Sequence, residues 1–92
     1  MNEIWLFLAF GAMPDVALFL GIGHGLAKGQ LHPRAVRLYN ALHHPVAPVA
    51  LAAAALVAEP SLLAGAAGWA THIVVDRLAG YGLRTPDGFQ RA

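Results

Sequence analysis

Four features that the chain lacks or has little of narrow the function classes to which it can belong. It contains no cysteine, which excludes disulfide bonds, thiolate metal sites and cysteine nucleophiles. Charged residues make up only 12% of its 92 residues, whereas an ordinary soluble domain carries about 25%. The formal net charge is +1, so no nucleic-acid partner is expected. The first apolar run lacks the basic residues and the cleavage site of a signal peptide, so we expect no cleaved leader.

Apolar residues are abundant instead. Hydrophobic types make up 58% of the chain and the mean hydropathy is +0.56. A soluble protein this short could bury only part of that surface, so we expect an integral membrane protein in contact with the lipid bilayer. Three apolar stretches, at about 4–26, 35–58 and 61–81, approach the roughly 20 residues needed to cross the hydrocarbon core.

The predicted fold class is therefore all-α, with a single transmembrane helical domain over residues 1–92. It has three spanning helices and a short cytoplasmic tail at 82–92. Pro14 lies within the first stretch. Because its ring nitrogen cannot donate a helical hydrogen bond, we expect that helix to be kinked or broken there.

Basic residues are distributed unevenly between the connections. They occur at Lys28, Arg34 and Arg37 between the first two stretches, but not in the Glu59 turn between the second and third. The tail adds Arg84 and Arg91. The positive-inside rule therefore places the first connection and the C-terminus in the cytoplasm, and the N-terminus outside.

Ionisable residues interrupt all three apolar stretches. Asp15 lies in the first and His43 in the second, while His72 and Asp76 share one helix face of the third at spacing i, i+4. Such groups are costly in a membrane and usually face the bundle interior. At about 1.5 Å rise per residue, His43 and His72 reach similar depths in the cytoplasmic half of the bilayer. We predict that His43, His72 and Asp76 face one interhelical space.

Four blocks of polar, proline and glycine residues stand out along the chain. In order they are Met13-Pro-Asp15, Tyr39-Asn-x-x-His43, His72-x-x-x-Asp76-Arg77-x-x-Gly-Tyr-Gly-Leu-Arg84 and Pro86-Asp-Gly-Phe89. Together they resemble a small bacterial membrane family, domain of unknown function 4260, over nearly the whole chain. The resemblance implies a multi-pass protein of the bacterial inner membrane with an uncharacterised activity. Members of that family usually carry another apolar helix before the Pro-Asp block, so the chain is expected to lack the family's first helix.

The histidines and aspartates allow three interpretations. In one, Asp15, His43, His72 and Asp76 bind a divalent metal ion such as zinc, iron or manganese, since imidazole nitrogen and carboxylate oxygen are suitable ligands. In another, the same groups only hydrogen-bond across helices and fix their packing. In a third, Gly68 leaves room one turn before His72 for a haem or a chlorophyll-type pigment held by the imidazole. We rank the hydrogen-bond network first and the pigment last.

Further residues are expected to support this site. Roles around the metal ligands, or in the network, are predicted for Tyr39, Asn40, His44 and Arg77. Asn40 would orient a ligand, whereas Arg77 is expected to reach the lipid headgroups rather than pair with a carboxylate. Pro45 and Pro48 should loosen the second helix near the site, which could open a cavity.

Small residues and low helix count suggest association with other helices. Gly65 and Gly68 offer a surface that a neighbouring helix can approach closely, so we expect a homo-oligomer or other membrane subunits as partners. Two functions follow from different classes. The favoured one is a non-catalytic accessory or structural subunit of a membrane complex. The other is a membrane-embedded metal-binding protein, or a metal-dependent hydrolase acting through a bound water. The sequence assigns no catalytic residue and does not decide whether the protein is an enzyme.

Overall fold

A computed structural model describes residues 3–90, and this part of the chain is helical apart from its connections. The elements in order are α1 (Glu3–Ala12), the 3₁₀ turn η1 (Met13–Asp15), α2 (Val16–Leu20), the 3₁₀ turn η2 (Pro33–Ala35), α3 (Val36–His43), α4 (Val46–Ala58) and α5 (Leu62–Leu78). Residues 3–90 contain no strand, only an isolated antiparallel bridge between Arg84 and Gln90. The predicted all-α class is confirmed.

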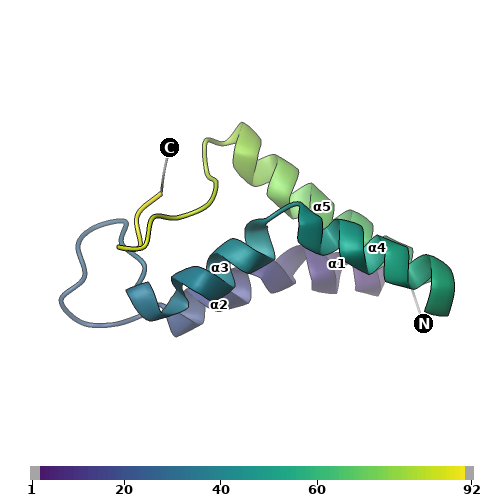
Figure 1. Ribbon diagram of the computed structural model, residues 1–92, viewed down its shortest axis with the longest axis horizontal. Helices are drawn as coiled ribbons and strands as arrows, with labels where there is room; N and C mark the ends of the chain where they lie inside the picture. The colour runs from purple at the N-terminus through teal and green to yellow at the C-terminus, as the bar shows by residue number, and fades with distance from the viewer. Residues whose placement is uncertain (1–2, 91–92) are drawn as a thin grey trace.

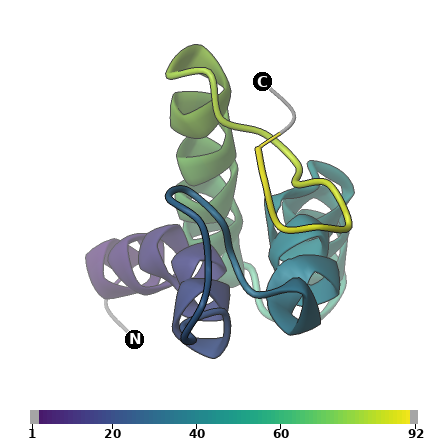
Figure 2. The same ribbon diagram turned by 90° about the vertical axis from the view of Figure 1, so that its left-hand side faces the viewer.

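The helices form two arms of an elongated molecule measuring 43 × 21 × 20 Å (Figure 1). In one arm α1 and α4 pack against α5, and in the other α2 lies alongside α3. Figure 2 shows the 21–32 loop and the C-terminal segment at the end formed by α2 and α3. The arms join where η1 and the α3–α4 junction meet α5.

Glycines allow α1 and α5 to approach closely. A Cβ atom on Gly68 would overlap the carbonyl oxygen of Phe7, and one on Gly65 would meet the ring of Phe10. Gly11 faces the backbone of Gly68 from the other helix. Gly65 and Gly68 thus lie where α5 approaches α1 closely.

The three predicted spans are not confirmed as three membrane-crossing helices. Within residues 3–90, only the segment 3–20 is long and apolar enough by itself. The segments 33–43 and 46–58 qualify together only if their 50° bend lies within one span. Helix α5 has 17 residues, or about 26 Å at 1.5 Å per residue, against a hydrocarbon core of about 30 Å.

Hydrogen bonds at the helix ends explain why the helices end earlier than predicted. The first predicted span stops at Leu20, the end of α2, where the Arg34 guanidinium donates to the carbonyls of Leu20 and Ile22 at 2.9 and 2.7 Å. These bonds satisfy helix-end carbonyls that would otherwise lack partners. Helix α5 ends in a Schellman motif, in which Gly80 has φ +92 and Tyr81 N–H donates to the Asp76 carbonyl at 2.8 Å.

Much of the apolar surface of the described chain faces outward. Large hydrophobic side chains that are at least half exposed include Ile4, Trp5, Leu8, Val16, Phe19, Ile22, Val46, Val49, Leu56, Val57, Val74, Val75, Leu78 and Tyr81. Apart from Ile22 and Tyr81, which lie in connections, they belong to α1, α2, α4 and α5. Exposed apolar surface on this scale is typical of a protein that contacts lipid or a protein partner.

The α1–α5 contact leads to a first prediction. Replacing Gly68 by Val should lower the free energy of unfolding by about 1–3 kcal/mol, because the new side chain forces α1 away from α5. Ala67→Val places the same side chain on an exposed position of the same helix and should have little effect. Thermal unfolding of both variants, followed by circular dichroism, checks this. Equal loss in the two variants would contradict the packing role of Gly68.

Candidate metal centre

The structure brings four ionisable side chains to one point. Asp15 comes from η1, His43 from the end of α3, and His72 and Asp76 from α5. One potential ligand atom from each residue lies within 4.8 Å of every other. The prediction that His43, His72 and Asp76 face one interhelical space is confirmed, and Asp15 joins them.

The distances between histidine nitrogens and carboxylate oxygens are short and similar. His43 Nε2 lies 3.3 Å from Asp15 Oδ1 and 3.5 Å from Asp76 Oδ2. His72 Nε2 lies 3.2 Å from each of the same two oxygens. In a tetrahedral zinc site with ligands at about 2.1 Å from the ion, neighbouring ligand atoms are about 3.4 Å apart. Four edges of the cluster therefore already have the length that a tetrahedral site needs.

Backbone carbonyls hold both imidazoles in place. His43 Nδ1 lies 2.8 Å from the Tyr39 carbonyl oxygen, and His72 Nδ1 lies 2.6 Å from that of Gly11. A carbonyl oxygen only accepts, so each Nδ1 must carry the proton. In its neutral form the ring then presents the Nε2 lone pair to the cluster. This arrangement, with a hydrogen bond on the far nitrogen, is the one that metal-binding histidines use.

Without a cation, the centre of the cluster would be unfavourable. Two lone pairs and two carboxylate oxygens would face one another with nothing positive between them. Protonating both imidazoles would supply that charge, but charge-assisted N–H···O bonds are usually about 2.7–2.9 Å long. The four observed distances are longer. Moreover, His72 Nε2 is buried and makes no hydrogen bond within residues 3–90, despite lying near both oxygens. His43 Nε2, in contrast, lies within hydrogen-bonding distance of Asp15 Oδ1 at 3.3 Å. The geometry is compatible with a shared metal ion and with shared protons.

Exposure varies across the four side chains. The His43 side chain is 3% exposed and that of His72 is 13% exposed, whereas the values for Asp76 and Asp15 are 26% and 51%. The site is therefore closed on its histidine side and open to the surroundings beside Asp15. A metal ion held here could take a water or another small ligand from that open side.

Comparison with known families gives one match, and it covers the site. The model of the family described as domain of unknown function (DUF4260) matches residues 1–92. The chain belongs to this family. No curated protein and no solved structure matches the chain. Family membership confirms the resemblance drawn from the sequence blocks, and leaves the function of this DUF4260 member to be inferred from its site.

In this DUF4260 member, interruptions in the helices position two of the four candidate ligands, Asp15 and His43. Pro14 is fully buried and lies in the first turn of η1, where its missing N–H is tolerated. The turn carries Asp15 toward α3. Helix α3 ends at His43, and Val46 N–H then donates to His44 Nδ1 at 3.1 Å. The interruption expected at Pro14 is present as the 3₁₀ turn η1.

Trp69 stabilises the break between α3 and α4. Its indole N–H donates to the carbonyl oxygen of Leu42 at 2.7 Å. In an unbroken helix that carbonyl would accept from the Val46 N–H, which is instead used by His44. Trp69 thus anchors α5 to the last turn of α3, beside His43.

The C-terminal segment 80–90 packs onto α3 and reaches the residues behind His43. The Asn40 side-chain amide donates to the Arg84 carbonyl at 3.0 Å and its oxygen accepts from Arg84 N–H at 2.7 Å. The Gln90 side chain donates to the Tyr39 hydroxyl at 3.1 Å. The Arg84 guanidinium lies 4.7 Å from the centre of the Tyr39 ring, and that ring stacks on His43 at 3.9 Å.

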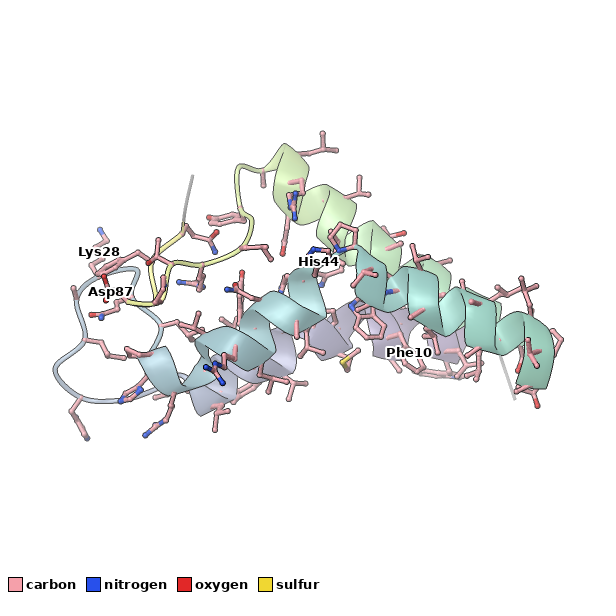
Figure 3. All side chains as sticks on the ribbon, in the orientation of Figure 1. Phe10, Lys28, His44 and Asp87 are labelled. Carbon is pink, nitrogen blue, oxygen red and sulfur yellow. The ribbon has the colours of Figure 1, made fainter. Side chains whose placement is uncertain are left out.

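The supporting residues predicted from the sequence divide into two groups. Tyr39 contacts a ligand directly, through its carbonyl and its ring. The Asn40 side chain holds the backbone of Arg84. His44 is exposed at the α3–α4 junction (Figure 3) and caps α4. Arg77 is exposed and forms no ion pair with the cluster.

The pigment interpretation does not fit the packing. The space beside Gly68 that a macrocycle would need is filled by the backbone of Phe7. His72 Nε2 points to two carboxylates rather than to an open face.

Sequence reasoning missed the Gly11 carbonyl and the Gln90 amide, because neither backbone acceptors nor a tail contact leaves a signal in residue spacing. Arg91 lies outside the described residues.

The tail contacts lead to a second prediction. Asn40→Ala removes both hydrogen bonds to Arg84. Docking of the C-terminal segment on α3 should therefore become less favourable by about 1–3 kcal/mol. Trypsin should then cleave after Arg84 roughly tenfold faster, because cleavage follows the population of the open form. Ser61→Ala removes an exposed hydrogen bond to Glu59 at the far end of the molecule and serves as control. An unchanged cleavage rate in Asn40→Ala would show that these bonds do not hold the tail.

Proposed function

We propose that this DUF4260 member is a membrane metalloprotein that holds a divalent metal ion between Asp15, His43, His72 and Asp76. The observation that carries the proposal is the set of four nitrogen–oxygen distances of 3.2–3.5 Å around one point. The fixed Nδ1 protons support it, since they leave only the Nε2 lone pairs for the ion.

Charge and geometry favour zinc among the candidate ions. Two carboxylates and two neutral imidazoles around a divalent cation carry no net charge, which suits a partly buried site. Four of the six distances between the ligand atoms match those of a tetrahedral zinc site, whereas manganese and magnesium favour six oxygen-rich ligands. Iron(II) shares the same ligand types, so loading experiments should include zinc, iron and manganese.

Metal content per protein tests the proposal directly. Wild-type protein, purified in detergent and loaded with zinc, should bind one ion per chain. His72→Gln removes an imidazole ligand and should abolish stoichiometric binding. His24→Gln is the matched control, because His24 is an exposed histidine outside the cluster. Folded wild-type protein that takes up none of the three metals would end the metal hypothesis. His72→Gln protein that still binds one ion would place the ligands elsewhere.

A carboxylate variant separates metal binding from a hydrogen-bond network. Asp76→Asn keeps the size and the hydrogen-bonding capacity of the side chain but removes its charge. A metal site should lose at least tenfold in affinity, whereas a network should lose about 0.6 kcal/mol of stability. Asp87→Asn, on an exposed turn, should change neither. Zinc affinity by competition with a chelator, measured beside thermal stability, distinguishes the two outcomes.

The apolar surface supports a membrane location for the whole chain. Segment 3–20 has a mean hydropathy of 1.6 with only 17% of it buried, and exposed apolar side chains continue over α4 and α5. We infer that α5 lies in the membrane beside the bent α3–α4 pair. The basic 28–37 connection and the tail are then on the cytoplasmic side. The N-terminus then lies outside.

This orientation is tested with reporters fused at the C-terminus. A reporter that is active only in the cytoplasm should be active after Ala92, and one active only after export should be silent, because basic connections are retained inside. The same pair of reporters inserted after Glu59 should give the reverse pattern. Export of the C-terminal reporter would overturn the orientation and, with it, the cytoplasmic position of the metal site.

The metal ion would have one of two roles, structural or catalytic. Ligands from η1, α3 and α5 make the ion a cross-link between both arms, which supports a non-catalytic structural or accessory subunit, in a homo-oligomer or a larger membrane complex. The half-exposed Asp15 side chain favours the second candidate, a hydrolase whose metal-bound water enters from the open side. Zinc-dependent release of a chromogenic ester or phosphoester, lost in Asp15→Asn with the ion retained, would support hydrolysis.

A further inference from the structure

A second feature, separate from the metal cluster, lies between α4 and α5. An apolar cavity of about 330 Å³ is lined from α4 and its N-cap by Pro45, Pro48 and Val49, and from α5 by Val74 and Arg77 among others. It occurs at the 50° bend between α3 and α4, where the prolines remove helical hydrogen bonds. The cavity that the sequence analysis associated with these prolines is present.

Arg77 is the charged residue of this cavity. Its side chain is exposed and forms no ion pair within residues 3–90. The neighbouring carboxylates, Asp76 and Asp15, are directed to the histidines of the cluster. An apolar pocket with an uncompensated guanidinium at its edge is complementary to a molecule with a hydrocarbon chain and an anionic head.

We propose that this cavity is a binding site for an anionic phospholipid. One acyl chain lies along Pro48, Val49 and Val74, and the phosphate is bound by the Arg77 guanidinium. Guanidinium groups suit phosphate because their fork of N–H donors can make two parallel hydrogen bonds to it. The proposal depends on the membrane location and not on the metal site.

The surroundings of the cavity match a lipid rather than a soluble ligand. Val49 is 64% exposed and Leu78 is 84% exposed, so the pocket continues into the apolar outer surface without a polar rim on those sides. Arg77 lies in the last turn of α5, the end that leads to the basic tail and that we place at the cytoplasmic headgroups. Anionic lipids concentrate at that leaflet and attract basic side chains.

The headgroup contact is tested with lipids of the same chains and different charge. Wild-type protein in detergent is titrated with phosphatidylglycerol or phosphatidylcholine, and bound lipid is counted by native mass spectrometry. Phosphatidylglycerol should bind about fivefold more tightly, the preference that one basic residue near an anionic headgroup provides. Arg77→Gln should remove the preference. Arg37→Gln, an exposed arginine on α3 that does not line this cavity, should retain it.

The acyl-chain contact is tested with a matched pair of variants. Val74 and Val75 are adjacent on α5 and are 56% and 57% exposed, but only Val74 lines this cavity. Val74→Trp should fill the cavity and reduce binding of both lipids at least tenfold, whereas Val75→Trp should not. Circular dichroism confirms that each variant folds.

Three results would overturn the lipid site. They are equal binding of the two lipids by wild-type protein, equal losses in Arg77→Gln and Arg37→Gln, and equal losses in Val74→Trp and Val75→Trp. The second would show a general effect of positive charge, and the third a general effect of added bulk. Zinc content is measured on the same samples. A protein that fails to bind zinc but shows the predicted lipid pattern would retain this inference while losing the proposed function.

Discussion

Two hydrogen bonds from imidazole Nδ1 to backbone carbonyls fix the chemistry of this protein. They turn the Nε2 atoms of His43 and His72 toward the same two carboxylates. With the rings held in this way, two imidazole nitrogens and two carboxylate oxygens converge on one point, an arrangement that a cation would stabilise. The rest of the fold can be understood as the means by which three segments of backbone are held around that point.

The interruptions of the helices are part of this arrangement. The turn at Pro14 brings Asp15 to the cluster, and the break after His43 frees the Leu42 carbonyl that Trp69 then binds. On the other arm Gly68 allows the α1 backbone to lie against α5, which brings the Gly11 carbonyl within 2.6 Å of His72. The positions of Asp15 and of the Leu42 carbonyl thus depend on the interruptions, whereas that of the Gly11 carbonyl depends on the close approach of α1 and α5.

The C-terminal segment connects the tail blocks of the sequence to the site. The Asn40 side chain makes hydrogen bonds with both the N–H and the carbonyl of Arg84, as a neighbouring strand would. The Gln90 side chain donates to the hydroxyl of Tyr39, whose ring stacks on His43. Figure 3 shows Lys28 and Asp87 at the end where the 21–32 loop meets this segment. In the DUF4260 fold, residues distant in the sequence therefore support one histidine, while the opposite face of α5 carries a separate apolar cavity with its own cation.

The sequence by itself determined the helical class, the break at Pro14 and the residues of the candidate site. Those features depend on local chemistry: apolar runs, a ring without an N–H, and costly charges that must share an interior. Tertiary structure decided the rest. It decided that Asn40 binds the tail, that Gly68 receives α1 instead of a pigment, and where each helix stops. These outcomes depend on contacts between distant segments, such as Arg34 with the Leu20 carbonyl and Gly11 with His72. Residue spacing along one helix carries no information about a partner that only folding brings near.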